Sequence, residues 1–281
     1  MVIKSQNLSA YNDVVKGFQD ECIRKDITIK SIYDMKGKMK VGRKIVRKIM
    51  KEKPNFVLTI GVLATTIAKE KLKEIPMIFC MVINHERFQL TGQNITGIST
   101  EIAIEEQFKG YQTILDSLQN LGVIYDPSKT GNIMVSAETK AKDIGMNLVK
   151  YEIDSPKMVS EALESLVGRI DALWLLPDST VITKKSFNII KSTTLENNIP
   201  LLCMSDVFVK AGALAAVFSN YKCVGKQAAQ LAGEILERLS PCSLGIVNPD
   251  SFNLAINTDT AEKLGLKLEA MLGEPHIIVY P

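Results

Sequence analysis

Short apolar runs alternate with longer amphipathic stretches along most of the chain. The runs are rich in β-branched and aliphatic residues, and they lack the polar–apolar alternation of half-exposed strands. They are 55–60, 75–82, 122–125, 147–151, 171–176 and 200–204. Strands that are apolar throughout and are separated by helices are typical of a parallel sheet that is covered on both faces. The pattern therefore predicts an α/β fold.

The order of these elements is repeated in the two halves of the chain. The matching segments, in chain order, are 2–4, 11–24, 41–51, 53–61 and 75–82 in the first half and 122–125, 132–144, 156–167, 169–177 and 199–204 in the second. Each half thus follows one βαβαβ plan. Two copies of one plan predict two similar lobes, each with its own parallel sheet.

Polar or glycine residues follow the predicted strands at the point where each strand ends. In parallel βα units these carboxyl ends meet along one edge of the sheet, and ligands bind beside that edge. Each residue alone could also be an ordinary turn or helix-capping residue. Because the whole set converges on one predicted edge, we interpret it as a candidate binding site. The set is Ser5, Gln6, Asn7, Gly61, Asn84, Asp126, Ser128, Asp178, Ser179, Thr180, Ser205 and Asp206.

Composition narrows the classes of protein. The 281 residues include 34 basic and 31 acidic side chains, a net charge of +3, and we interpret the basic run 42–48 as a solvated helix face and not as a nucleic-acid patch. No apolar run approaches the roughly 18–20 residues of a membrane span. The five cysteines contain no C-x-x-C pair, so zinc and thioredoxin-like spacings are missing. Cys80 and Cys203 lie in apolar strands, and we expect buried thiols there.

The motifs of common catalytic classes are missing. His85 and His276 are the only histidines, and neither accompanies a G-x-S-x-G turn. The run 126–131 lacks the glycine spacing of a phosphate-binding loop. We therefore expect no enzyme activity, no cofactor and no metal. Two alternatives stay open: a cytosolic small-molecule sensor of the same fold, and a racemase-like enzyme that uses acidic residues or paired cysteines.

Several motifs, in order and over essentially the whole chain, give a family resemblance. They are Lys16-Gly17-Phe18, the segment 59–66 (Thr-Ile-Gly-Val-Leu-Ala-Thr-Thr), 94–99, 125–128, 176–180 and the long stretch 205–229. Together they resemble the ABC-transporter substrate-binding family of the tryptophan-binding lipoproteins, sometimes called TrpX-like. The resemblance implies a type I periplasmic-binding-protein architecture with two Rossmann-like lobes, parallel sheets and a ligand cleft between the lobes.

The chain connections expected for this architecture define the lobes. The N-terminal lobe is expected to comprise 1–99 and 220–249, and the C-terminal lobe 100–219 and 250–281. The expected hinge residues are Ser99, Thr100 and Ser219. Closure of such hinges around a ligand is the mechanism that the resemblance implies.

The resemblance also implies a function. Family members are extracytoplasmic solute-binding components of ABC importers, periplasmic or lipid-anchored, and deliver their ligand to a membrane permease. The chain opens without the apolar region of a signal peptide, and we interpret that segment as removed. We expect a monomer that binds a small solute, with an amino acid, aromatic by preference, as the ligand. No nucleic-acid partner is expected.

The expected site combines three kinds of group. The helix that opens at Gly61 offers free amides to a ligand carboxylate, unless Thr65 or Thr66 merely supports the helix start. Asp178 and Asp206 could accept from a ligand ammonium, or could act only as caps. Aromatic side chains such as Tyr11 could line an apolar slot. The candidate ligand-binding residues are Ser5, Tyr11, Gly61, Leu63, Ala64, Thr65, Asn84, Ser99, Tyr125, Asp178, Ser179, Thr180, Ser205, Asp206 and Phe208.

Overall fold

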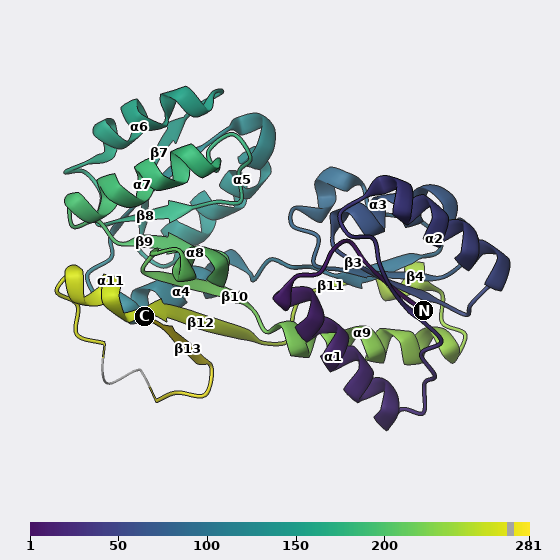
Figure 1. The fold of residues 1–281 in the computed structure, drawn as a ribbon. Helices are drawn as coiled ribbons and strands as arrows, with labels where there is room; N and C mark the ends of the chain where they lie inside the picture. The colour runs from purple at the N-terminus through teal and green to yellow at the C-terminus, as the bar shows by residue number, and fades with distance from the viewer. Residues whose placement is uncertain (269–272) are drawn as a thin grey trace. The chain divides into compact units, whose positions relative to one another are not determined.

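The computed structural model describes residues 1–268 and 273–281, which form two compact units (Figure 1). Unit 1 comprises Met1–Glu101 and Ser219–Ser251, and unit 2 comprises Ile102–Phe218 and Phe252–Pro281. The chain therefore passes from one unit to the other after Glu101, after Phe218 and after Ser251.

Unit 1 is built on a parallel sheet in the order β11-β5-β4-β3-β1-β2. Its strands are β1 (Val2–Lys4), β2 (Ile32–Asp34), β3 (Val57–Ile60), β4 (Met77–Cys80), β5 (Ile95–Ile98) and β11 (Ile246–Val247). Its helices are α1 (Ser9–Arg24), α2 (Met39–Glu52), α3 (Val62–Lys71), the 3-10 helix η1 (His85–Phe88), α9 (Tyr221–Leu236) and α10 (Pro241–Leu244). Every residue of β3, β4 and β5 is buried, as expected for strands that are covered on both faces.

Helices α1 and α9 pack side by side, although they lie about two hundred positions apart in the sequence (Figure 1). Glycines bring their backbones together: a Cβ at Gly17 would lie 2.0 Å from the carbonyl oxygen of Lys222, and one at Gly225 would lie 2.1 Å from that of Val14. No other residue fits at either position without separating the helices. This contact places the second segment of unit 1 on its sheet.

Unit 2 is built on a second sheet, in the order β13-β12-β10-β9-β8-β6-β7. Its strands are β6 (Asn120–Tyr125), β7 (Asn147–Glu152), β8 (Ala172–Leu175), β9 (Leu201–Cys203), β10 (Ala215–Ser219), β12 (Phe252–Asn257) and β13 (Ile277–Tyr280). Its helices are α4 (Ile104–Ile114), α5 (Pro127–Asp143), η2 (Pro156–Met158), α6 (Val159–Leu166), α7 (Lys184–Glu196), α8 (Asp206–Lys210) and α11 (Thr258–Lys263). Neighbouring strands in the series β7, β6, β8, β9 and β10 pair in parallel.

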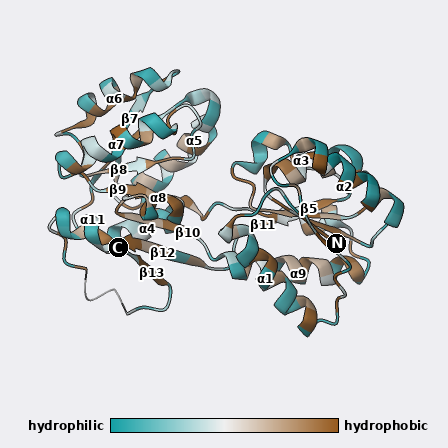
Figure 2. Cartoon of the chain, in the orientation of Figure 1, coloured by the Kyte–Doolittle hydropathy of each residue, from teal (hydrophilic) through white to brown (hydrophobic). Residues whose placement is uncertain are grey.

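The core of unit 2 lies between its sheet and helices. Trp174 on β8 is fully buried and meets Phe108 of α4 edge to face, with ring centroids 5.0 Å apart. In Figure 2 the strands are coloured mainly as hydrophobic, and the surrounding helices carry both colours. The arrangement confirms the predicted α/β class with two mostly parallel sheets.

The sequence pattern left several short elements unassigned. They are β2, β5, β10, β11 and β13, none longer than five residues. Runs of that length are too short to establish a period of their own. The expected helix over 156–167 begins as the 3-10 helix η2, which Ser155 caps, and continues as α6. Among the described residues, no helix combines the length and the apolar character needed to cross a bilayer.

Candidate functional site

The candidate residues lie where strands end in each unit. Ser5, Gly61 and Ser99 follow β1, β3 and β5 in unit 1. Asp178 and Ser205 follow β8 and β9 in unit 2. Because the paired strands are parallel, each set shares the carboxyl edge of its own sheet.

The first cluster in unit 1 joins the ends of β1 and β3. The Ser5 hydroxyl donates to the Ile60 carbonyl at 3.0 Å and accepts from the Ala64 N–H at 2.9 Å. Between them Gly61 has φ +88° and ψ 162°, a conformation open essentially to glycine alone. A Cβ there would lie 2.5 Å from the Tyr11 hydroxyl oxygen and 2.8 Å from that of Ser5. Gly61 is therefore required both by its backbone angles and by its neighbours.

Unpaired donors collect at the start of α3. Ser5 occupies the Ala64 amide, but within the described residues the amides of Val62 and Leu63 have no acceptor. The half-buried Tyr11 hydroxyl beside Gly61 also has no partner in the same part of the chain. Burial raises the pKa of Tyr11, and the nearby Cys80 thiol adds to the rise, so the hydroxyl stays protonated and able to donate. This arrangement suits an anionic group such as a carboxylate.

Thr65 has a structural role in this cluster. Its buried hydroxyl donates to the Gly61 carbonyl at 2.9 Å and lies 3.0 Å from the hydroxyl of Thr59. It thus supports the start of α3, which was the alternative interpretation of this residue. Leu63, by contrast, is half-buried on the same first turn.

A second cluster in unit 1 forms around Glu101, a residue that sequence reasoning missed. Its carboxylate accepts from the Asn84 backbone N–H and, at 2.7 Å, from the Ser99 hydroxyl. The His85 Nδ1 atom lies 3.7 Å away, an ion-pair distance that is too long for a hydrogen bond. Asn84 and Ser99 were predicted; the signal for Glu101 was its place just after β5.

The charges of this cluster stabilise each other. The Glu101 carboxylate raises the pKa of His85 against the effect of burial, and Glu86 adds to the rise. Burial pushes the pKa of Glu101 upward, but His85, the Asn84 amide and the Ser99 hydroxyl outweigh burial, so that pKa is lowered. Both groups are therefore charged over a wider pH range than either would be alone.

This pair gives a pH prediction. A histidine whose pKa is raised in the folded state stabilises the fold below its ordinary pKa of about 6.5, and that contribution is lost as the pH rises through the folded pKa. We therefore expect the urea midpoint of the wild type, relative to His85→Gln, to be higher at about pH 5.5 than at about pH 8.5. Glu101→Gln should remove the same difference. If the urea midpoints of the wild type and His85→Gln differ by the same amount at both pH values, the pairing is refuted.

In unit 2, Asp178 and Asp126 bind each other's loops. One Asp178 oxygen accepts from the Asp126 N–H at 2.9 Å and from the Thr130 hydroxyl at 2.7 Å. The other accepts from the N–H groups of Thr180 and Val181, at 2.8 and 3.3 Å. In return, Asp126 accepts from the Thr180 hydroxyl at 2.6 Å. We call this arrangement the aspartate clasp.

The clasp shows what Asp178 does in the folded protein. The residue is only 1% exposed, and both of its oxygens already accept hydrogen bonds from its own unit. It holds the loops after β6 and β8 together. It does not cap α7, as one interpretation of the sequence held, because Thr183 caps that helix in a capping box with Ser186. Between the clasped residues, Ser179 is exposed.

The end of β9 leads into the short helix α8. Ser205 caps it, and Asp206 in its first turn accepts from Lys210 at 2.6 Å and from the Tyr280 hydroxyl at 3.1 Å. The Asp206 carboxylate raises the pKa of Lys210. Half-buried Phe208 contacts Phe187, with centroids 5.1 Å apart. Lys210 and Tyr280 were not predicted, and Tyr280 comes from the last strand of the chain.

Two kinds of predicted candidate lie inside the core. Tyr125 is buried and donates to Glu152 at 2.5 Å, and burial together with that carboxylate raises its pKa to about 12. Cys80 and Cys203, the thiols considered for a racemase-like reaction, are fully buried. Burial raises the pKa of both thiols, so they stay protonated and out of reach of a substrate.

Comparison with known proteins identifies relatives over nearly the full chain. Residues 2–276 match the family described as ABC transporter substrate binding protein. A tyrosine-binding protein of Clostridioides difficile is 26% identical over 262 residues, which are 90% of this chain and 75% of that protein.

Solved structures agree in fold. A ligand-free, open structure of a substrate-binding protein with adhesive properties from Clostridium difficile superposes with a TM-score of 0.83 at 21% identity, over 99% of this chain and 97% of that one. A domain from Streptococcus pneumonia in complex with L-Trp gives 0.71 at 17% identity, over 99% and 98%. At these identities the likeness concerns the fold.

Proposed function

This chain belongs to the family of ABC transporter substrate binding proteins, and we propose that it captures an aromatic amino acid outside the cytoplasm for import. A relative is named for tyrosine binding, and a structure of the same fold holds L-Trp. Both ligands share a zwitterionic head and an aromatic side chain. The proposal is that this chain recognises the same two features.

The observation that carries the proposal is the group of unpaired donors at the start of α3. The amides of Val62 and Leu63, the Tyr11 hydroxyl and the positive end of the helix dipole suit a carboxylate. Because Gly61 has no side chain, the Tyr11 hydroxyl can lie close to the backbone at this point, next to the amides. In this proposal, the ligand carboxylate binds the carboxyl edge of unit 1.

We assign the ligand ammonium to unit 2. Asp206 lies at the carboxyl edge, and among its partners Lys210 is an exposed side chain that a ligand ammonium could replace. Asp178 has no such replaceable partner, so its proposed role is to position Ser179 and Thr180 for the ligand. Tyr11 and Phe208, both half-buried, are the proposed contacts of the aromatic ring.

The proposed transport mechanism is a hinge movement of the two units. The proposal is that a ligand held by both carboxyl edges favours a closed state, with Ser99, Thr100 and Ser219 near the chain crossings as hinges. A membrane permease of the ABC type would then receive the ligand. The protein acts in this scheme as a monomer in the periplasm or anchored at the outer face of the membrane.

A thermal-shift screen tests the ligand class. A ligand that binds only the folded state raises stability by RT ln(1 + [L]/Kd), about 2.7 kcal/mol at a hundredfold excess over Kd. We expect Tyr, Trp or Phe to raise the melting temperature by several degrees, and we expect sugars and nucleosides to leave it unchanged. The decarboxylated analogue tyramine is the matched control and should give no shift. If only sugars or nucleosides raise the melting temperature, the ligand is a solute of that class and not an amino acid.

A further inference from the structure

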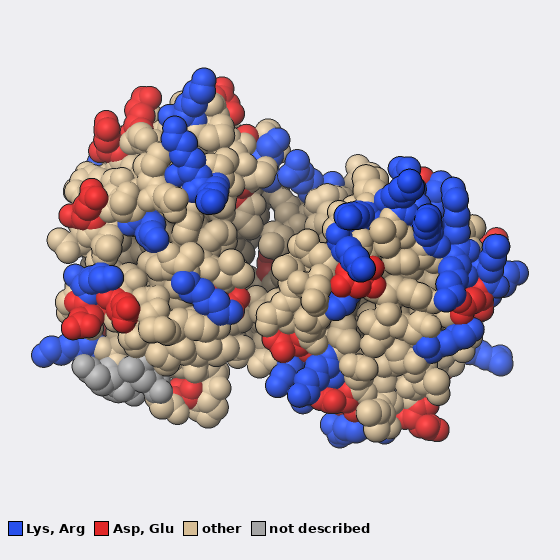
Figure 3. Space-filling view, viewed as in Figure 1, with Lys and Arg blue, Asp and Glu red and all other residues tan. Residues whose placement is uncertain are grey.

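A strongly basic surface lies on unit 1, along α2 and the residues on either side of it. Figure 3 shows Lys and Arg gathered over this part of the molecule. The exposed basic residues are Lys36, Lys38, Lys40, Arg43, Lys44, Arg47, Lys48, Lys51 and Lys53. The net charge of the whole chain is only +3. The surface is therefore a local concentration of charge, and we call it the basic face.

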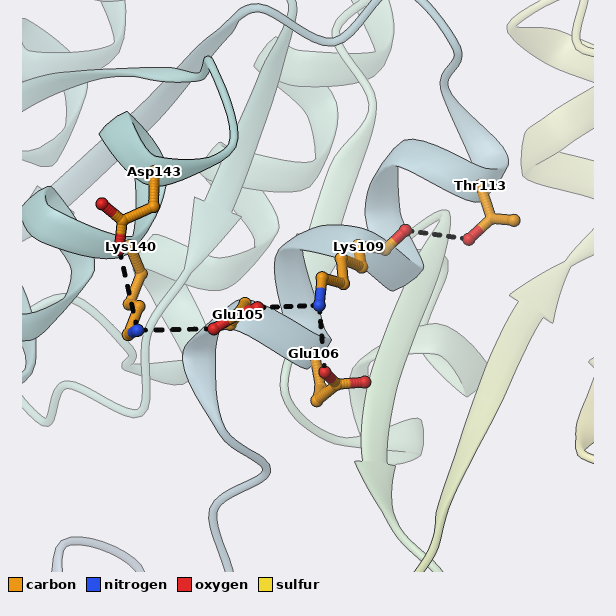
Figure 4. A network of polar contacts seen from close by, with 6 residues as sticks. All are labelled: Glu105, Glu106, Lys109, Thr113, Lys140 and Asp143. Atoms are coloured by element: carbon orange, nitrogen blue, oxygen red, sulfur yellow. Dashed lines mark hydrogen bonds and ion pairs between the residues drawn. The ribbon is translucent and has the colours of Figure 1, made fainter.

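The charge of the basic face is hardly compensated. Its single ion pair among the described residues joins Lys48 to Glu52 at 3.8 Å, and Glu52 also pairs with Lys30 at 2.6 Å. The surface of α4 and α5 in unit 2 is different, as Figure 4 shows: Lys109 reaches both Glu105 and Glu106, and Lys140 reaches both Glu105 and Asp143. A helix whose charges serve only its own stability usually alternates their signs, as α4 and α5 do. On α2 the repulsion between cations is left without that compensation.

Apolar side chains border the basic face. Met39 is 51% exposed and Met50 is 44% exposed. They lie eleven positions apart, about three helical turns, and therefore on the same line along the helix. Val46 and Ile49 anchor α2 in unit 1, and at about 100° per residue Val46 lies within about 40° of both methionines. The exposed methionines therefore lie at the boundary between the core-facing side of α2 and the basic face. Cations next to exposed apolar side chains are typical of helices that lie on a membrane surface.

A cavity continues the basic face at the amino-terminal edge of the sheet. It lies before β3 and β4, has a volume of about 530 Å³, and is lined by residues that include Met50, Lys53, Lys71, Lys73 and Glu74. Three lysines and one glutamate line it, and Lys71 also pairs with Glu70 at 2.7 Å. Gly61 and the start of α3 lie at the opposite ends of the same strands. The cavity is therefore separate from the proposed solute site.

We propose that the basic face and this cavity dock unit 1 on an anionic phospholipid surface. Seven of the nine exposed cations are lysines, which act as mobile point charges and suit a diffuse layer of headgroups better than the bidentate geometry of a protein or nucleic-acid partner. The methionines would enter the headgroup region, and the cavity would receive a lipid phosphate. Since the solute site is at the other edge, docking and solute binding are independent.

Vesicle binding tests the proposal with the full chain. The probes are vesicles of phosphatidylcholine alone and of phosphatidylcholine with about 30% phosphatidylglycerol, at about 0.1 M salt. We expect binding to the anionic vesicles alone. Because each cation near such a surface contributes about fivefold, the triple variant Arg43→Gln, Arg47→Gln, Lys51→Gln should lose on the order of a hundredfold in partition coefficient. The matched control Lys157→Gln, Lys184→Gln, Lys185→Gln removes the same charge from exposed lysines of unit 2 that form no ion pair with any described residue, and it should stay close to the wild type.

Further readouts separate the alternatives. The thermal shift by the solute should be the same in all three proteins, which shows that the variants are folded. The double variant Met39→Ser, Met50→Ser should weaken vesicle binding with no change of charge. Equal losses in the triple variant and its control would reduce the effect to net charge and overturn the proposal. Equal binding to neutral vesicles, or tighter binding to duplex DNA or to polyglutamate than to anionic vesicles, would overturn it as well.

Discussion

Asp178→Ala is expected to lower the free energy of unfolding by about 3–5 kcal/mol, because it removes a buried anionic acceptor and leaves its donors unpaired. The N–H groups of Asp126 and Thr180 and the Thr130 hydroxyl would all lose a partner inside the protein. Urea unfolding measures the effect. The single tryptophan, Trp174, is buried in unit 2, so its fluorescence reports the unit that contains the change.

Two control variants distinguish the loss of the hydrogen bonds of the aspartate clasp from the loss of a negative charge. Asp178→Asn keeps one acceptor oxygen and should be destabilised by about half as much. Asp154→Ala removes an exposed aspartate of the same unit and should change stability by less than about 0.5 kcal/mol. If Asp178→Ala lowers the free energy of unfolding no more than Asp154→Ala does, the first interpretation, in which Asp178 accepts from the ligand ammonium, is restored. If Asp178→Ala unfolds like the wild type but no longer binds an aromatic amino acid, then Asp178 accepts directly from the ligand ammonium.

The fold was predictable because its signal is periodic and repeated. Runs such as 171–176 are apolar throughout, and their spacing from the helices is the same in both halves of the chain. The short strands β2 and β11 carry no such signal, because their two or three residues are placed by a neighbouring strand. Their positions depend on tertiary packing.

The candidate site was predictable in location but less so in role. The carboxyl edge of a parallel sheet follows from the order of strands and helices, and Ser5, Gly61 and Ser99 lie there. Which groups satisfy one another does not follow from that order. The partners of Asp178 lie as many as 52 positions away, and Tyr280 reaches Asp206 across 74. Contacts over such separations exist only once the sheet has formed.

The same limit explains why the caps and the ligand contacts could not be told apart. An aspartate after a strand looks alike in the sequence whether its oxygens are occupied or open. Asp178 is enclosed by donors from two loops, whereas the partners of Asp206 include an exposed lysine. Both aspartates are buried, so it is their neighbours, which only the fold supplies, that distinguish a positioning residue from a candidate ligand contact.

Gly61→Ala is expected to reduce affinity for the amino acid ligand by about a hundredfold or more, because a misplaced group in a preorganised site costs several hydrogen bonds at once. The new Cβ would lie 2.5 Å from the Tyr11 hydroxyl oxygen and 2.8 Å from that of Ser5. Ser5 is fixed by Ile60 and Ala64, so Tyr11 must move away from the start of α3. Isothermal titration with the amino acid that gives the largest thermal shift measures the loss.

Gly245→Ala is the matched control for this change. Gly245 is in the same unit and has φ +65° and ψ −160°, also a region that side chains avoid, but a Cβ there would meet nothing within 4 Å. Backbone strain should lower the free energy of unfolding of both variants by about 1–3 kcal/mol, and Gly245→Ala should bind the ligand like the wild type. Equal losses of affinity in the two variants would trace the effect to backbone strain. Unchanged affinity in Gly61→Ala would remove the carboxylate from the start of α3.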